Sequence, residues 1–292
     1  MTMKTDGQVI TITATINAPL NKVWDLFTGA QHIIRWNNAS DDWQTSYAEN
    51  NLKPGGKFLS RMEARDGSQG FDFTGSYGEV IPGRSIDYAI ADGRKVHVTF
   101  SETPGGTQVT ESFEAEKLNS ATRQEAGWQA ILDNFRKYVE AYGAREMYHF
   151  EITIGNSPEN IFKIMLADET FRKWTSAFDP NSHFNGSWEK GKKILFLGKD
   201  AAGNTSGMAC RIRENIPGRF LSIETLGEVI DGKEITTGER AEIWRGSLEN
   251  YTLDPAGKKT LLSIDTDIPA DFRASFLELW PEALAKLKSL CE

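Results

Sequence analysis

Hydrophobic residues recur along residues 127–142 at the spacing of one face of an α-helix. They follow the i, i+3, i+4, i+7 rule, which places such positions on one side of a helix. The stripe consists of Trp128, Ile131, Leu132, Phe135, Val139 and Tyr142. Most of the other positions are charged or polar, and Gly143 follows where a left-handed C-terminal cap would stand. We therefore expect a long helix with one buried side.

A second stripe of the same design closes the chain. Its members are Leu277, Trp280, Leu284, Leu287 and Leu290. Each predicted helix follows a run of strand-like segments, and Trp280 holds the place in the second stripe that Trp128 holds in the first. Both indole rings are expected to be buried. Two equivalent helices indicate two copies of one domain.

Strand patterns fill the chain ahead of the first long helix. Residues 9–16 alternate between apolar and polar types, which is the period of a half-buried strand. Pro19 then opens a short helical region that ends near Trp36, because proline suits a first helical turn. Further strands are predicted at Phe58–Met62, Phe71–Tyr77, Ser85–Ile90, Lys95–Ser101 and Gln108–Phe113. The short glycine-containing turns between them favour antiparallel hairpins.

The second half of the chain repeats this order. The clearest echo is Ile-Pro-Gly-Arg, which stands at residues 81–84 and again 135 residues later at 216–219. Trp280 follows Trp128 by 152 residues, so the second copy has gained 152 − 135 = 17 residues, which we place around residues 231–246. A repeat of this length indicates a duplicated domain, because solenoid repeats are roughly 20–50 residues long. Residues 143–147 are expected to link the copies.

These elements predict an α+β protein with two tandem helix-grip domains. In each, a curved antiparallel sheet would wrap around the long C-terminal helix, with two short helices after the first strand. We place the first domain at residues 8–143 and the second, more divergent, domain at residues 148–291.

Composition narrows the classes of function. The 292 residues and the 39% hydrophobic content can supply a core to each domain. The formal net charge is −8 and no basic stripe is present, so we expect no nucleic-acid partner. Cys210 and Cys291 have the spacing of neither a disulfide framework nor a metal site, which favours a reducing compartment. No apolar run approaches membrane-spanning length, so we expect a cytoplasmic protein without a membrane partner.

Two motifs suggest chemistry but have simpler interpretations. Residues 186–193 nearly match a phosphate-binding loop, but Lys193 stands where a hydroxyl is needed and the next residues read as a strand. Asp265 and Asp267 share one face of a predicted strand, and we expect that face to be solvated. We therefore predict no metal site and no cofactor.

No catalytic constellation is visible either. The four histidines lack His-x-x-x-His spacing, and no nucleophile motif is present. His97 lies in a predicted strand, where Val96, Val98 and Phe100 share one face and His97 shares the other with Thr99. Either face could meet an internal cavity, so His97 is the one candidate for a catalytic base.

The motifs of the first half resemble a known family. Residues 18–19 and 23–24, residues 35–36, Leu-Lys-Pro-Gly-Gly-Lys-Phe at 52–58, Gly-Glu-Val-Ile-Pro-Gly-Arg at 78–84 and Gly-Trp at 127–128 carry the resemblance. The chain resembles the START-like helix-grip superfamily. Within it, the chain is similar to the family of the C-terminal domain of the activator of the ninety-kilodalton heat-shock protein ATPase. The second half keeps fewer of these motifs.

The resemblance implies a hydrophobic cavity between sheet and helix. In the first domain we expect it to be lined by Phe58, Phe71, Phe73, Tyr88, His97, Trp128, Leu132 and Phe135. In the second domain we expect a cavity lined by Trp174, Phe196, Trp244 and Trp280. Apolar ligand sites are built from such side chains with few polar groups.

Three functions are consistent with this reading. The first is a non-enzymatic binding protein for a small hydrophobic molecule, held in at least the first domain. The second is a chaperone partner that stimulates the heat-shock ATPase. The third is an enzyme of the cyclase or hydrolase kind, with His97 as the base.

Overall fold

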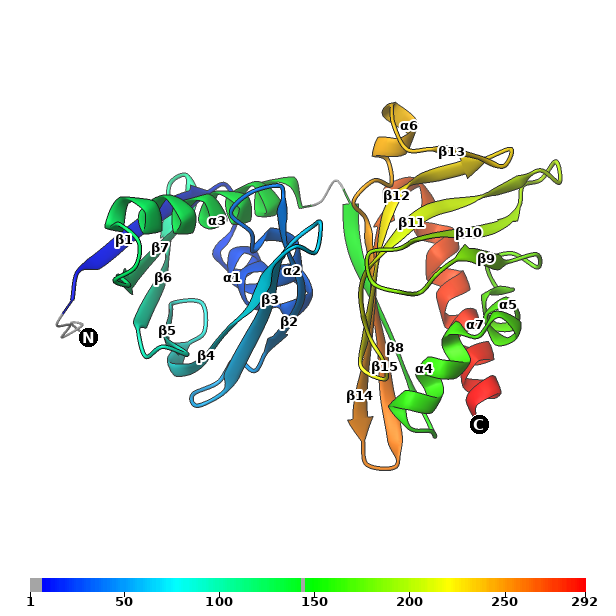
Figure 1. Ribbon diagram of the computed structural model, residues 1–292, viewed down its shortest axis with the longest axis horizontal. Coiled ribbons are helices and arrows are strands. Elements are labelled where there is room, and N and C mark those ends of the chain that lie inside the picture. The colour runs from blue at the N-terminus through cyan, green and yellow to red at the C-terminus, as the bar shows by residue number, and fades with distance from the viewer. Residues whose placement is uncertain (1–6, 143–144) are drawn as a thin grey trace. The chain divides into compact units, whose positions relative to one another are not determined.

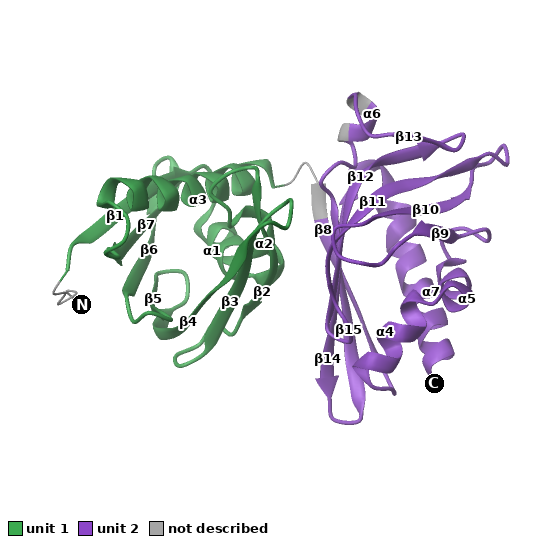
Figure 2. Ribbon diagram, in the orientation of Figure 1, with its two compact units in different colours: residues 1–142 green, residues 143–292 purple. Residues whose placement is uncertain are grey.

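The computed structural model describes residues 7–142 and 145–292. The chain divides into two compact units, unit 1 at residues 1–142 and unit 2 at residues 143–292 (Figure 2). Each unit is an α+β fold in which a curled antiparallel sheet wraps around a long helix at the end of the unit (Figure 1). The predicted tandem helix-grip architecture is confirmed.

Unit 1 begins with a strand and a pair of short helices, continues through a series of hairpins and ends in the long helix. Its elements are β1 (Val9–Ile16), α1 (Leu20–Thr28), α2 (Ala30–Trp36), β2 (Trp43–Asn50), β3 (Lys57–Ala64), β4 (Gly70–Ile81), β5 (Ser85–Ile90), β6 (Lys95–Thr103), β7 (Gly106–Glu114) and α3 (Ala121–Ala141). The sheet order is β1-β7-β6-β5-β4-β3-β2, and neighbouring strands are antiparallel. The first strand therefore pairs with the last, which helps the sheet curl around α3.

The core of unit 1 lies between the inner face of this sheet and α3. Val96, Val98 and Phe100 of β6 are buried there, because alternate residues of a strand point to the same face. From α3, Leu132 and Phe135 of the predicted stripe are also buried. These residues form one apolar cluster together with the inward residues of β1 and β7.

The structure corrects two details of the predicted layout and does not test a third. Strand β2 was not predicted, because Gln44, Thr45 and Ser46 interrupt the apolar alternation expected of a strand. The cap predicted at Gly143 lies outside the described residues. The linker predicted at residues 143–147 is wrong for residues 145–147, which already belong to the first strand of unit 2.

Unit 2 repeats the same plan with additions. Its elements are β8 (Arg145–Ile154), α4 (Pro158–Leu166), α5 (Asp168–Thr175), β9 (His183–Gly186), β10 (Lys193–Lys199), β11 (Thr205–Ile216), β12 (Phe220–Ile230), β13 (Lys233–Ile235), α6 (Glu239–Glu242), β14 (Leu248–Ala256), β15 (Lys259–Pro269), the 3₁₀ helix η1 (Ala270–Phe272) and α7 (Arg273–Cys291). The sheet order is β8-β15-β14-β12-β11-β10-β9, and β13 pairs with β12. Strand β13 and helix α6 lie in the stretch where the extra residues were placed.

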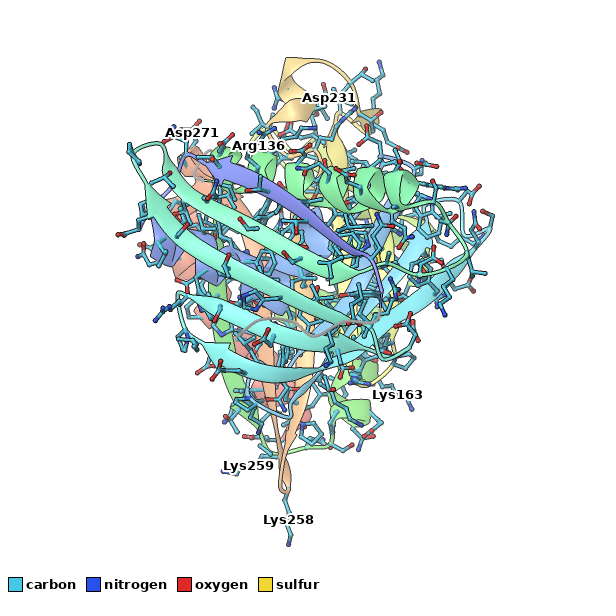
Figure 3. All side chains as sticks on the ribbon, turned by 90° about the vertical axis from the view of Figure 1, so that its left-hand side faces the viewer. Arg136, Lys163, Asp231, Lys258, Lys259 and Asp271 are labelled. Atoms are coloured by element: carbon cyan, nitrogen blue, oxygen red, sulfur yellow. The ribbon has the colours of Figure 1, made fainter. Side chains whose placement is uncertain are left out.

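Charged side chains project outward from the elements of both units. Lys258, in the turn between β14 and β15, extends beyond the tip of that hairpin (Figure 3). Within the described residues, no helix combines the length and the apolar character needed to cross a bilayer.

The two Ile-Pro-Gly-Arg turns occupy equivalent places, between β4 and β5 and between β11 and β12. In each, the arginine N–H donates to the isoleucine carbonyl, at 2.9 Å for Arg84 and 3.0 Å for Arg219. The glycines adopt positive φ angles, 69° at Gly83 and 71° at Gly218. Proline followed by a glycine of positive φ is typical of a type II turn. The turn sets the register of both hairpins.

Replacing Gly83 by alanine should lower the free energy of unfolding by about 1–2 kcal/mol, because a Cβ is disfavoured at positive φ. The matched control is Gly78→Ala in β4, where an added Cβ would meet Asp87 at an ordinary 3.5 Å. Urea denaturation of the full chain measures both variants. Equal losses in the two variants would contradict the turn assignment.

Candidate functional site

Unit 1 contains a hollow between the inner face of its sheet and its helices. The cavity volume is about 230 Å³. Strands β3, β4, β5 and β7 form one wall, and α1, α2 and α3 close the other. The lining residues are Phe27, Thr28, Ile33, Trp36, Asn37, Asn50, Phe58, Ser60, Met62, Phe71, Phe73, Tyr77, Ile86, Tyr88, Glu111, Trp128 and Ile131.

Aromatic rings line most of this hollow and contact one another in series. The ring of Phe58 lies 5.3 Å from those of both Tyr77 and Tyr88, measured between centroids. Across the hollow, Phe73 meets the indole of Trp128 edge-on at 6.2 Å. Gly75 makes room for this wall, since a Cβ there would lie 2.5 Å from the Phe58 ring. Contacts of this kind hold the rings in fixed orientations.

Several polar groups that line this hollow have partners in the protein. The Tyr77 hydroxyl donates to Asn50 Oδ1 at 2.6 Å, and Asn50 Nδ2 donates to the Thr28 carbonyl at 2.6 Å. Burial raises the pKa of Tyr77 well above its ordinary value, so this hydroxyl stays protonated. These hydrogen bonds stabilise the wall of the hollow and do not depend on a ligand.

Glu111 also lines this hollow. It lies on the inner face of β7 and is only 8% exposed. Burial raises the pKa of its carboxyl from an ordinary 4.5 to about 7. Burial raises the pKa of Tyr88, and the nearby Glu111 carboxyl adds to this effect. A titratable group with a shifted pKa inside a cavity is a candidate functional residue.

The sequence-predicted residues of the first domain fall into two groups. Phe58, Phe73, Tyr88 and Trp128 line the hollow, and Phe71 lies at its edge with 49% of its surface exposed. The remaining three do not line it, namely Leu132, Phe135 and His97.

Leu132 and Phe135 belong to the solid core instead, where they are 1% and 0% exposed. His97 lies on the outer face of β6, where its Nδ1 is 2.6 Å from Asp87 Oδ1. The alternation of β6 explains this placement, because Val96 and Val98 take the inner face and exclude their neighbour from it. The assignment of His97 to the cavity is therefore corrected, and its geometry gives no support for a base that acts there.

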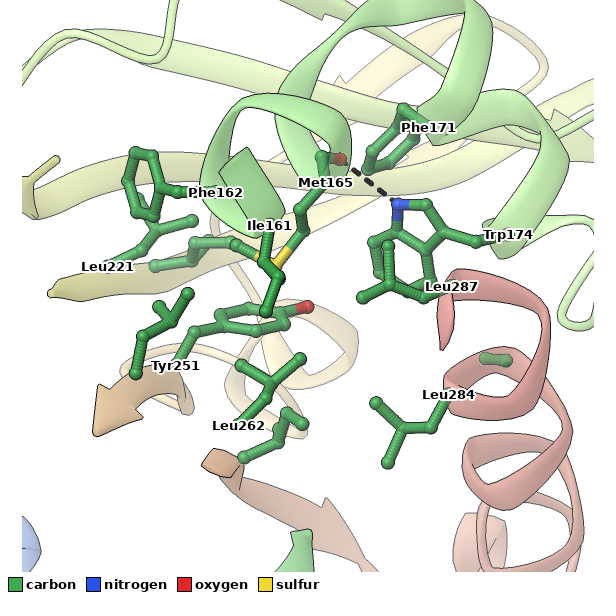
Figure 4. Packing of buried hydrophobic residues seen from close by; sticks show 14 of the residues in the cluster. Ile161, Phe162, Met165, Phe171, Trp174, Leu221, Tyr251, Leu262, Leu284 and Leu287 are labelled. Atoms are coloured by element: carbon green, nitrogen blue, oxygen red, sulfur yellow. Dashed lines mark hydrogen bonds between the residues drawn. The ribbon is translucent and has the colours of Figure 1, made fainter. Parts of the chain in front are cut away.

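Unit 2 contains a larger hollow, with a cavity volume of about 600 Å³. It lies between the inner face of strands β10, β11, β12, β14 and β15 and the helices α5 and α7. All four residues predicted for the second domain line it, namely Trp174, Phe196, Trp244 and Trp280. The indole N–H of Trp174 donates to the Met165 carbonyl at 3.0 Å, which fixes that ring beside the core (Figure 4).

Two polar groups stand out inside the hollow of unit 2. The Tyr251 hydroxyl donates to Glu249 Oε1, and burial raises the pKa of Glu249 to about 7 in spite of that bond. Trp280 is 1% exposed, and its Nε1 has no hydrogen-bond partner among the described residues. A buried donor without a partner is unusual in a folded protein. An acceptor atom on a bound molecule would satisfy it.

The other two motifs lie on or between strands of unit 2. Lys193 begins a strand, so the helix that a phosphate-binding loop requires is missing there. Alternation places Asp265 and Asp267 on the same side of β15, but Asp267 is only 8% exposed, is among the residues that line the hollow of unit 2 and accepts a hydrogen bond from the Leu248 N–H at 2.9 Å. The prediction of a solvated face is therefore wrong for Asp267. Among the described residues, no cluster of side chains could hold a metal ion.

Glu111 and Glu249 were missed by the sequence analysis, although each leaves a signal. Each carboxylate occupies an inward position of an alternating strand, between Val109 and Phe113 in β7 and two residues before Tyr251 in β14. An acidic residue in such a position lowers the stability of the fold, has a function, or both.

A curled antiparallel sheet that grips a helix around an aromatic hollow defines the helix-grip class of proteins. Residues 17–140 match the family model described as Activator of Hsp90 ATPase homolog 1-like protein. A solution structure of an AHSA1-like protein from Aeromonas hydrophila is 45% identical, covering 46% of this chain and 93% of that chain, with a TM-score of 0.45. The chain therefore belongs to the Activator of Hsp90 ATPase homolog 1-like family through unit 1.

Other comparisons extend this result. The solution structure of Chr148 from Cytophaga hutchinsonii is 41% identical over 46% of this chain and 92% of that chain, with a TM-score of 0.40. The di-domain ARO/CYC StfQ from the steffimycin biosynthetic pathway is 11% identical over 97% of this chain and 98% of that chain, with a TM-score of 0.59. At that identity the likeness shows the fold alone, and it covers both units. None of the curated proteins compared with this chain matches it.

Proposed function

We propose that this chain is a non-enzymatic binding protein that holds a small, mostly apolar molecule in its helix-grip hollows, foremost that of unit 2. The observation that carries the proposal is the hollow of about 600 Å³ in unit 2. Sites for drug-sized ligands have volumes of roughly 300–1,000 Å³ and are lined mainly by apolar and aromatic side chains. The hollow of unit 2 has both properties.

The polar groups in this hollow are compatible with the same role. Its lining also includes charged side chains that already have partners in the protein, namely Asp179, Asp200, Glu228, Arg240 and Asp267. Glu249 and the unpartnered Nε1 of Trp280 share the lining of the hollow with rings such as Phe196 and Trp244. Polar groups placed in a mainly apolar cavity fix the orientation of a ligand. We therefore expect the ligand to be mainly apolar and to carry at least one hydrogen-bond acceptor for Trp280.

An apolar dye that fluoresces on burial should bind the full chain, and native mass spectrometry of freshly purified protein should reveal any retained molecule. Met208→Trp adds an indole on the inner face of β11 and should abolish most of the dye binding to unit 2. The matched control is Arg211→Trp, because Arg211 lies on the opposite face of the same strand. Uptake that is unchanged by Met208→Trp, or absent from the wild-type protein, would count against the proposal.

A second candidate is a chaperone partner that stimulates the heat-shock ATPase. Its support is the family match over residues 17–140, together with the description that the family model bears. Such a partner implies a cytoplasmic location, which the free thiols of Cys210 and Cys291 support. An ATPase assay with the purified chaperone tests this role directly. No stimulation and no complex would remove it.

A further inference from the structure

Glu111 is a buried acidic residue that lines the hollow of unit 1. Its carboxyl has no hydrogen-bond or ion-pair partner among the described residues, although only 8% of the residue is exposed. Its neighbours on the inner face of β7 are Val109 and Phe113, which are both apolar. An ionised carboxylate in such surroundings is strongly disfavoured unless a group of opposite charge is close to it. None of the described residues provides such a group.

Aromatic rings surround the same hollow. Trp36, Phe58, Phe73, Tyr88 and Trp128 all line it. The faces of aromatic rings carry partial negative charge, so they attract organic cations as well as apolar surfaces. A carboxylate and several ring faces in one cavity therefore suit a molecule that is apolar over most of its surface and positively charged at one end.

The other described residues that line the cavity are uncharged. Among the described residues that line it, none is a lysine, an arginine or a histidine, and Glu111 is the one acidic side chain. The other titratable groups are Tyr77 on β4 and Tyr88 on β5, and burial raises the pKa of both, so they are neutral. Helices α1, α2 and α3 and strand β3 contribute uncharged side chains. The cavity therefore has a single ionisable acid and an otherwise neutral wall.

We propose that unit 1 binds a small organic amine, with the ammonium group beside Glu111 and the apolar body among the aromatic rings. The volume of about 230 Å³ limits the size of the ligand, because it lies below the roughly 300 Å³ at which sites for drug-sized ligands begin. One ring with a short amine chain is of suitable size. The inference rests on the proposed binding role of the hollow in unit 1 and adds the chemical class of ligand.

Isothermal titration calorimetry of the full chain with 2-phenylethylamine tests the inference, and 2-phenylethanol is the neutral probe of nearly the same shape. At pH 8 we expect the amine to bind at least about tenfold more tightly than the alcohol, as for a charge-assisted contact. Burial raises the pKa of Glu111 to about 7, and the carboxyl must lose its proton to bind the amine. The affinity for the amine should therefore fall about tenfold for each pH unit below about 7 and level off above it.

Two variants separate this site from other acids. Glu111→Gln keeps the shape of the side chain, and we expect it to weaken amine binding at least about tenfold and to remove the pH dependence. Glu114→Gln makes the same change on the outer face of the same strand and should leave amine binding as it is.

The outcomes distinguish the two proposals for unit 1. Equal binding of amine and alcohol, unaffected by Glu111→Gln, would overturn the amine class and leave a neutral ligand in its place. Binding of neither probe would overturn both the amine site and the binding role of this hollow. The pH profile of the wild-type protein decides the amine class even if Glu111→Gln fails to fold.

Discussion

Truncating Trp280 to alanine should lower the free energy of unfolding of unit 2 by about 3–5 kcal/mol, the usual cost of removing a large buried aromatic side chain. Trp280 is 1% exposed. Its ring stacks on Phe150 at 5.7 Å and meets Phe178 edge-on at 5.1 Å, so both would lose a partner. Chemical denaturation of the full chain, followed by circular dichroism and by intrinsic fluorescence, measures the loss.

The matched variant is Trp128→Ala in unit 1. The repeat places the two tryptophans in equivalent positions, but Trp128 is only half-buried in the structure. It stacks on Phe113 at 4.1 Å, while part of its ring faces the hollow. We therefore expect a smaller loss of about 2 kcal/mol, because less apolar surface returns to water on unfolding. Equal losses at the two positions, or a loss below about 1 kcal/mol for Trp280→Ala, would contradict this description of the helix packing.

The second large effect is a dependence of stability on pH that originates at Glu111. The pKa of this carboxyl is raised from 4.5 in the unfolded chain to about 7 in the folded protein. Between these values the folded state keeps a proton that the unfolded state has lost, so unfolding releases a proton and becomes easier as the pH rises. The contribution of Glu111 is therefore fully present below about pH 4.5 and is lost as the pH passes about 7. The total loss is about 3 kcal/mol.

Glu111→Gln isolates this contribution, since glutamine cannot ionise. The free energy of unfolding of Glu111→Gln minus that of the wild-type protein should rise by about 3 kcal/mol from pH 4.5 to pH 7 and then stay level. The difference removes the separate contribution of Glu249, which titrates in unit 2 over the same range. Glu114→Gln, on the outer face of β7, serves as the control. A flat difference for Glu111→Gln would show that its carboxyl is solvated in the folded protein.

The fold of this protein was largely predictable because its signals are local. The alternation in β1, the stripe of α3 and the repeated Ile-Pro-Gly-Arg turn each depend on residues close together in the chain. The turn is the clearest case, since proline followed by glycine at positive φ predicts the same hairpin wherever it occurs. Strand β2 was not predicted, because its polar residues interrupt the apolar–polar alternation on which such a prediction depends.

The sequence predicted which kinds of residue line the candidate site, but not every individual residue that does. Aromatic residues such as Phe58 and Trp128 were assigned to the first hollow, and the structure places them there. His97 was assigned with them because the parity of β6 alone does not say which face is inner. Glu111 was passed over because a single glutamate in a strand is usually solvated, and only the register of β7 against β6 and β1 places it inside.

The sequence by itself determined the class of fold, the duplication and the family, since periodicity, turns and motifs are properties of short stretches of chain. The tertiary structure decided which face of each strand is inner, how much volume each helix leaves unfilled and which acids are buried. Those properties arise where segments distant in the chain meet, so a stripe on α7 can predict that Trp280 is buried but not that its Nε1 is left without a partner. The larger hollow in unit 2 and the unpaired acid in unit 1 are results of that kind.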